Sequence, residues 1–248
     1  MTNRYKLQIA YDGTCYCGWQ IQSNARSIQQ EIEKALSIVL RTPIKITGSG
    51  RTDQGVHAKG QVAHFDLEEK IITTKLLLSL NGLLPLDIRI KNIEEVQENF
   101  HSRFSAKSKV YHYHFWTDPV IDPMSYLYRT HMRKPFSKAL VKEALECFIG
   151  TKDFTTFANL RGHQEVLKSA VRIIKRIDLV DQEGGFRLEF EGNGFLYKMV
   201  RNIVGVLIEV GQKRREIQSI ASLFDQKNRK AINMPAPAHG LFLHHVIY

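Results

Sequence analysis

The sequence has few cysteines and no long apolar run. Its three cysteines, Cys15, Cys17 and Cys147, are odd in number and lack the paired C-x-x-C spacing of zinc and redox sites. No run approaches the roughly 20 apolar residues that cross a bilayer. The first residues lead into a strand-like segment without the apolar region of a signal peptide. These absences argue against a cysteine-based metal or redox site and a membrane span, and we expect a cytoplasmic protein.

Acidic residues are scarce relative to basic ones. Asp and Glu number 25 against 35 Lys and Arg, which gives a formal net charge of +10. This excess favours a polyanionic partner such as nucleic acid, although a generally basic, solvated surface would give the same count. The hydrophobic fraction of 43% and the charged fraction of 24% are typical of a folded, soluble protein.

Hydrophobic periodicity divides the chain into two related halves, 1–104 and 105–248. In the first half we expect helices at 28–40 and 74–80, and strands at 5–11, 43–47, 61–67 and 87–96. In the second half we expect helices at 137–148, 196–210 and 216–224, and strands at 109–116, 171–179, 186–191 and 241–248. This order predicts an α+β protein. Its halves would be ferredoxin-like or RRM-like, with mainly antiparallel sheets packed around a central active-site cleft.

A glycine-rich segment, predicted as a loop over 48–60, holds the best candidates for chemistry. Asp53 has glycines on both sides and shares the loop with Arg51, Thr52 and His57. Glycine permits positive φ and close approach of the backbone to a ligand. An isolated Asp-x-Gly would usually form only an Asx-turn. An acid, a guanidinium, a hydroxyl and an imidazole on one loop are more typical of a polar site.

The same loop resembles the active-site motif of the TruA-type tRNA pseudouridine synthases. The resemblance extends along the chain through further blocks in the family's order: Tyr11-Asp12-Gly13 with Tyr16 and Gly18-Trp19-Gln20, Phe100-His101-x-Arg103 with Lys109-x-Tyr111-x-Tyr113, Asp153-Phe154-Thr155-x-Phe157, Met199 to Gly205, and Gly240-Leu241-x-Leu243. Cys17, Phe242 and the stretch Leu160 to Leu167 depart from the pattern. Several ordered blocks make a coincidental match very improbable.

The resemblance implies that Asp53 is the catalytic aspartate, that Arg201 pairs with it, and that Tyr111 packs against the target base. An arginine beside a partly buried carboxylate would keep it ionised at neutral pH. Tyr111 could instead be a core residue of an aromatic strand, and Arg201 could be solvated beside an apolar helix stripe. The family pattern alone favours Tyr111 over its neighbours. Arg201 lies near the start of a largely apolar helix, where a paired arginine is more expected than a solvated one.

Three other loop residues are expected to bind substrate: Arg51, Thr52 and His57, the last as loop support or RNA contact. The resemblance implies a homodimer that needs no cofactor or metal. His112 and His114 alternate with aromatic residues on one strand, and His244-His245 point to opposite faces of another, which argues against a metal site. Basic residues cluster near 129–134, 168–176, 213–215 and 227–230, where they could hold phosphates without reading sequence.

The implied reaction is isomerisation of uridine to pseudouridine at tRNA positions 38, 39 and 40, in the anticodon stem-loop. The C1′–N1 glycosidic bond breaks, the uracil turns in the pocket, and C1′ joins C5. Asp53 could attack C1′, attack the base, or remove a sugar proton after cleavage, and the sequence leaves all three routes open. A non-catalytic RNA-binding module or a synthase with another RNA target are the alternatives. The intact set of Asp53, Tyr111 and Arg201 argues against the first.

Overall fold

The computed structural model describes residues 2–160 and 169–248, and the chain divides into two compact units. One unit comprises the residues up to Lys107 together with Phe242–Tyr248, and the other comprises Ser108–Leu241. The final strand, expected in the second half, therefore lies in the first unit except for its first residue, Leu241. Part of the departing stretch Leu160 to Leu167 lies outside the described residues.

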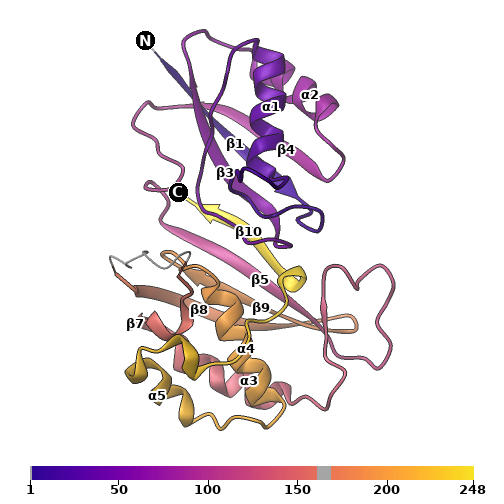
Figure 1. Cartoon of the computed structure of the whole chain (residues 1–248), viewed down its shortest axis with the longest axis vertical. Helices are drawn as coiled ribbons and strands as arrows, with labels where there is room; N and C mark the ends of the chain where they lie inside the picture. Colours follow the sequence, from indigo (N-terminus) through magenta and orange to yellow (C-terminus); the bar gives the residue numbers. More distant parts are fainter. Residues whose placement is uncertain (1, 161–168) are drawn as a thin grey trace. The chain divides into compact units, whose positions relative to one another are not determined.

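In the first unit, two helices cover one face of a sheet with the strand order β4-β1-β3-β10 (Figure 1). The elements are β1 (Asn3–Tyr11), α1 (Ile28–Leu40), β2 (Thr47–Gly48), β3 (His57–Leu67), α2 (Thr73–Leu83), β4 (Ile88–Val96) and β10 (Leu241–Ile247). β1 pairs antiparallel with both β3 and β4, whereas β10 runs parallel to β3. The helix expected at 28–40 is confirmed, with the Ser27 side chain accepting a hydrogen bond from the Gln30 N–H at its start.

In the second unit, the strand order is β5-β9-β8-β7, and β6 pairs in parallel with β5. The elements are β5 (Ser108–Trp116), β6 (Thr130–His131), α3 (Lys138–Leu145), β7 (Gly150–Asp153), β8 (Val171–Gln182), β9 (Gly185–Gly192), α4 (Met199–Gly211) and α5 (Ser219–Gln226). Short 3₁₀ turns lie at Glu146–Phe148, Thr155–Phe157, Arg229–Ala231 and Ala238–Gly240. β5, β9, β8 and β7 pair antiparallel in succession. The α+β class with mainly antiparallel pairing is confirmed.

Three predicted element boundaries are wrong for identifiable reasons. The strand expected at 43–47 is reduced to Thr47–Gly48, because the Ile44 and Ile46 N–H groups donate to side chains of α1. β3 begins at His57 rather than at residue 61, since β10 pairs with its first residues. The helix expected from 196 begins at Met199, because Lys198 has φ 59° and interrupts the helical backbone.

The described residues contain no helix both long enough and apolar enough to span a membrane.

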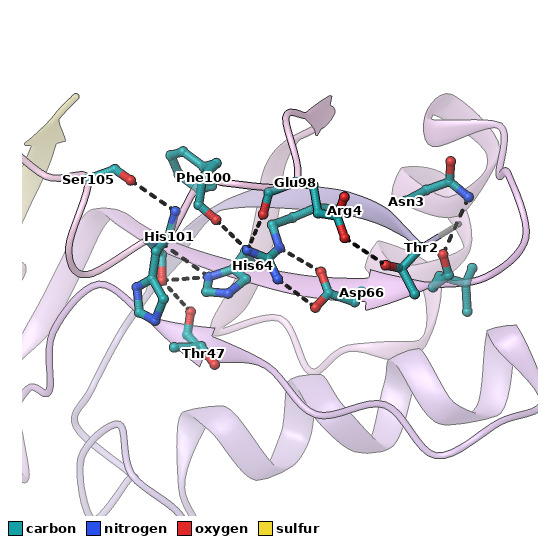
Figure 2. A network of polar contacts seen from close by, with 12 residues as sticks. Thr2, Asn3, Arg4, Thr47, His64, Asp66, Glu98, Phe100, His101 and Ser105 are labelled. Carbon is teal, nitrogen blue, oxygen red and sulfur yellow. Dashed lines mark hydrogen bonds and ion pairs between the residues drawn. The ribbon is translucent and has the colours of Figure 1, made fainter.

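A polar network ties the segment after β4 to the sheet of the first unit (Figure 2). Arg4 on β1 forms an ion pair with Asp66 on β3, with Nε 2.6 Å from Oδ1. The same guanidinium donates to the carbonyls of Glu98 and Phe100 at 2.6 and 2.8 Å. Beside it, His64 Nδ1 accepts a hydrogen bond from the Ser102 N–H at 3.2 Å. Arg4 and His64 therefore anchor the segment that leads out of this unit.

His64 makes the stability of this unit depend on pH. Burial lowers its pKa from 6.5 to about 4, and the charges of Arg4 and His101 act in the same direction against a smaller opposing effect of Asp66. Between these values the unfolded chain binds more protons than the folded one, so the free energy of unfolding falls as the pH drops from 6.5 to about 4. We expect His64→Gln to flatten this fall in urea titrations across the window. An unchanged pH dependence in the variant would contradict the assignment.

Candidate active site

The Asp53 loop connects β2 to β3 and is clamped by the chain that follows β1. Gly18 has φ +88°, and a Cβ there would lie 2.5 Å from the Thr52 carbonyl oxygen. The next residue, Trp19, donates its N–H to that same carbonyl at 3.1 Å. Only glycine allows this approach, because any side chain would collide with loop backbone. The Gly18-Trp19 motif therefore fixes the loop one residue before Asp53.

Asp53 opens a tight turn. The Val56 N–H donates to the Asp53 carbonyl at 3.1 Å, and Gly55, at the third position, has φ +74°. This conformation requires glycine in a turn of type II geometry. The Gly55 N–H in turn donates to the Tyr16 carbonyl at 3.4 Å. The turn is closed by main-chain groups, and the half-buried Asp53 side chain is carried on a backbone held from two sides.

Thr52 points into the interior of the unit. Its side chain is buried, and its Oγ1 lies 2.8 Å from the hydroxyl of the buried Tyr11. Burial raises the Tyr11 pKa, so the phenol stays neutral and available for this hydrogen bond. Thr52 therefore anchors the loop to β1, and its contact with substrate stays a prediction.

His57 is the first residue of β3, not a loop residue, and it is 1% exposed. Its Nδ1 lies 3.1 Å from the Gly13 nitrogen and 3.0 Å from Asp12 Oδ1. Its ring stacks on Phe242 of β10 with centroids 4.5 Å apart. Of the two roles considered for His57, the burial favours support of the fold beneath the loop over contact with RNA.

Of the four predicted site residues on this loop, Arg51 and Asp53 reach the surface. The Arg51 side chain is exposed, and its Nε donates to Gln20 Oε1 at 2.9 Å. The hydrogen bond that Nε donates restricts the plane of the guanidinium, so Gln20 orients Arg51.

The second unit carries Tyr111 and Arg201. Tyr111 lies on β5 opposite Phe190, and its ring meets Phe195 edge-on with centroids 5.1 Å apart. Arg201 lies in the first turn of α4 and is half-buried. Its Nε donates to the Ala236 carbonyl at 2.8 Å, and its own carbonyl accepts from the Ala236 N–H at 2.9 Å. Arg201 is thus held by the protein rather than solvated.

The structure groups Arg51, Thr52, Asp53 and His57 in one unit and places Tyr111 and Arg201 in the other. Among the described residues, no group of His, Cys, Asp and Glu could hold a metal ion.

Sequence reasoning missed Gln61, whose amide accepts from the Ser49 hydroxyl at 2.7 Å and donates to the Gly50 carbonyl at 2.8 Å. The side chain of Gln61 is fully buried and partnered, which only the folded structure reveals.

Comparison with known proteins identifies the class. A family model described as tRNA pseudouridine synthase matches residues 8–105 and 144–248. The chain therefore belongs to the tRNA pseudouridine synthase family, whose members are isomerases.

Full-length relatives narrow the class to the TruA type expected from the motifs. tRNA pseudouridine synthase A 1 of Protochlamydia amoebophila is 52% identical over 245 residues, which span 98% of this chain and 96% of that protein. tRNA pseudouridine synthase A of Chlamydia muridarum is 43% identical over 100% of this chain and 93% of its own length. The synthase A of Latilactobacillus sakei is 40% identical over the full length of both.

Proposed function

We propose that this protein isomerises uridine to pseudouridine at positions 38, 39 and 40 of the tRNA anticodon stem-loop, with Asp53 as the catalytic carboxylate. The relatives named tRNA pseudouridine synthase A support the substrate class. The observation that carries the assignment of Asp53 is the clamp around its loop, in which Gly18 and Trp19 fix the preceding carbonyl. A preorganised carboxylate needs little reorganisation when the substrate reacts.

The reaction is balanced without a co-reactant. The C1′–N1 bond breaks, N1 takes a proton, C1′ bonds to C5, and the C5 hydrogen leaves as a proton. An ionised Asp53 can act as nucleophile or base at the centres considered above. We propose that Arg201 pairs with this carboxylate. The proton lost from C5 supplies the assay, since tritium placed there is released into water.

We propose that Tyr111 supports the extruded uracil with its ring. An extruded base loses its stacking partners, and an aromatic side chain can replace them. The edge-on contact with Phe195 favours this role, because it fixes the ring orientation before substrate arrives.

Tyr111→Phe and Tyr111→Leu test the ring. Stacking on an aromatic ring contributes about 1–3 kcal/mol, so we expect leucine to lower kcat/KM for tritium release by roughly 5- to 150-fold. Phenylalanine should lose far less. Tyr126→Leu, at a surface tyrosine 56% exposed, is the matched control. Equal kcat/KM for the leucine variant and the wild type would refute the role.

Phosphate binding by the basic clusters is also a proposal, and the structure restricts its candidates. Arg215 pairs with Glu209 at 2.6 Å, and Arg176 with Glu191 at 3.2 Å, so both are engaged within the unit. The Arg229 guanidinium donates to Asn202 and Asn159 at 3.1 Å. Lys213 and Arg214 are better placed, because both are exposed at the end of α4. Lys168 of the second cluster lies outside the described residues.

Three further proposals concern the fold of each unit, the oligomeric state and the cellular location. We propose a ferredoxin-like plan for each unit, supported in the first unit by β4-β1-β3 with β2 paired to β3. A homodimer and a cytoplasmic location are proposed from the family resemblance.

The decisive experiment measures catalysis and target together. Purified protein should release tritium from 5-³H-uridine-labelled tRNA without added metal or cofactor. Pseudouridine mapping in tRNA from cells with and without the protein should lose signal at positions 38, 39 and 40. Binding of tRNA without tritium release would favour the RNA-binding module instead. Loss of pseudouridine at other positions would favour a synthase of altered target.

A further inference from the structure

A one-way chain of hydrogen bonds runs from the interior of the first unit to Arg51. Gln29 on α1 donates through Nε2 to Glu33 Oε1 at 2.8 Å and to the Ile46 carbonyl at 3.1 Å. Gln20 Nε2 donates to Gln29 Oε1 at 2.9 Å. Gln20 Oε1 then accepts from Arg51 Nε at 2.9 Å.

The direction of this chain is dictated by its inner end. The Glu33 carboxylate and the Ile46 carbonyl can only accept hydrogen bonds, so they require the NH₂ group of Gln29. The Gln29 carbonyl oxygen must therefore face Gln20, which in turn presents its own NH₂ group. The carbonyl oxygen of Gln20 is left facing Arg51, which can only donate. A reversed amide at any point would place two donors or two acceptors in contact.

The inner end of the chain is itself fixed. Glu33 and Gln29 are buried, at 6% and 9% exposure. Glu33 Oε1 also accepts from the Ile46 N–H at 3.0 Å, and Oε2 lies 3.2 Å from Lys45 Nζ. Buried polar groups with every partner in place resist reorientation, because breaking one bond leaves another group unsatisfied.

We propose that Gln29 and Glu33 are positioning residues for Arg51, which they orient through Gln20 for contact with the substrate RNA. The inference rests on the proposed function, since it assumes that Arg51 meets RNA. The new element is that residues of helix α1, outside the catalytic loop, set the orientation of the Arg51 guanidinium. Bidentate recognition of phosphate or of a base edge requires such a fixed plane.

A double-mutant cycle separates positioning from stability. Gln29→Leu removes the hydrogen bonds of Gln29 to Gln20 and Glu33 and fills the buried position with a side chain of similar size. We expect kcat/KM for tritium release to fall by about five- to tenfold, which corresponds to roughly one lost hydrogen bond. Arg51→Lys retains the charge but not the guanidinium plane. In the Arg51→Lys background, Gln29→Leu should have no further effect on kcat/KM.

Two further variants complete the design. Glu33→Leu removes the acceptor oxygen that orients Gln29, so kcat/KM should fall about as far as in Gln29→Leu. Gln30→Leu, at an exposed position of the same helix, is the matched control. Thermal unfolding of every variant identifies the temperature at which all are folded, and kinetics are compared there.

The outcomes are distinct. Equal losses from Gln29→Leu in both backgrounds, or no loss in the wild-type background, would overturn the positioning role. Wild-type activity in Arg51→Lys would also overturn it, by showing that the guanidinium plane is not needed. Failure of the proposed function would appear separately, as tritium release by the Asp53→Asn variant.

Discussion

Asp53→Asn is expected to abolish tritium release from 5-³H-uridine-labelled tRNA, with a loss of at least about a thousandfold in kcat. Asparagine has nearly the same size and can keep the turn, because the turn is closed by the main-chain carbonyl of residue 53. It can act neither as a nucleophilic carboxylate nor as a base at neutral pH. Binding of tRNA should largely persist, since the contact area and the basic surface are unchanged.

The control for this loss is Asp181→Asn. Asp181 is 73% exposed and pairs with Lys138 at the surface, so the same chemical change there should leave activity and stability near wild type. Tritium release, tRNA binding and thermal unfolding are measured for both variants. Substantial release by Asp53→Asn, with a matching unfolding curve, would rule out Asp53 as the catalytic carboxylate.

Gly18→Ala is the second change with a large expected effect, although residue 18 lies far from Asp53 in the sequence. The new Cβ would lie 2.5 Å from the Thr52 carbonyl oxygen and 3.0 Å from the Asp53 carbonyl carbon, at a φ of +88°. Both neighbours are backbone atoms, so relief requires the catalytic loop itself to shift. A displacement of about 1 Å can cost about a hundredfold in rate, and the strained backbone adds about 1–3 kcal/mol of destabilisation.

Gly82→Ala provides the comparison within the same unit. Gly82 lies in α2 and is exposed, and a Cβ added there would meet no neighbouring heavy atom within 4 Å. Alanine there should raise the free energy of unfolding by about 0.5–1 kcal/mol and leave kcat/KM unchanged. Denaturant unfolding and tritium release are measured on both. Near-wild-type turnover by Gly18→Ala would show that the clamp does not set the loop geometry.

The two large effects differ in kind. Asp53→Asn should remove catalysis and leave stability intact, whereas Gly18→Ala should lower both together. Comparing the two variants therefore distinguishes a residue that takes part in the reaction from a residue that holds the loop in place.

The sequence alone determined the parts of this protein that depend on local pattern. The strand expected at 5–11 lies within β1, where the alternate residues Tyr5, Leu7, Ile9 and Tyr11 are all buried. The helix expected at 28–40 agrees with α1, and the Ser27 side chain caps its start. The ordered motifs identified the family, and the family resemblance led to the proposal that Asp53 is the catalytic carboxylate. Such signals are readable because a helix or a half-buried strand repeats its environment every few residues.

Tertiary structure decided which residues far apart in the sequence contact one another. His57 was assigned to a loop, yet β10 from the far end of the chain pairs with it and Phe242 stacks on it, which makes it a buried strand residue. The strand expected at 43–47 is reduced to Thr47–Gly48, because the N–H groups of Ile44 and Ile46 donate hydrogen bonds to the side chains of Ser37 and Glu33 on α1.

The clamp on the Asp53 loop and the amide chain behind Arg51 are of the same kind. The sequence placed Gly18 and Gln20 in a family motif without saying what they do, and their contacts in the folded chain give each of them a role. A periodicity records which face of an element is buried, but not which group is buried against it. That choice depends on contacts between residues far apart in the chain, so it appears only once the chain has folded.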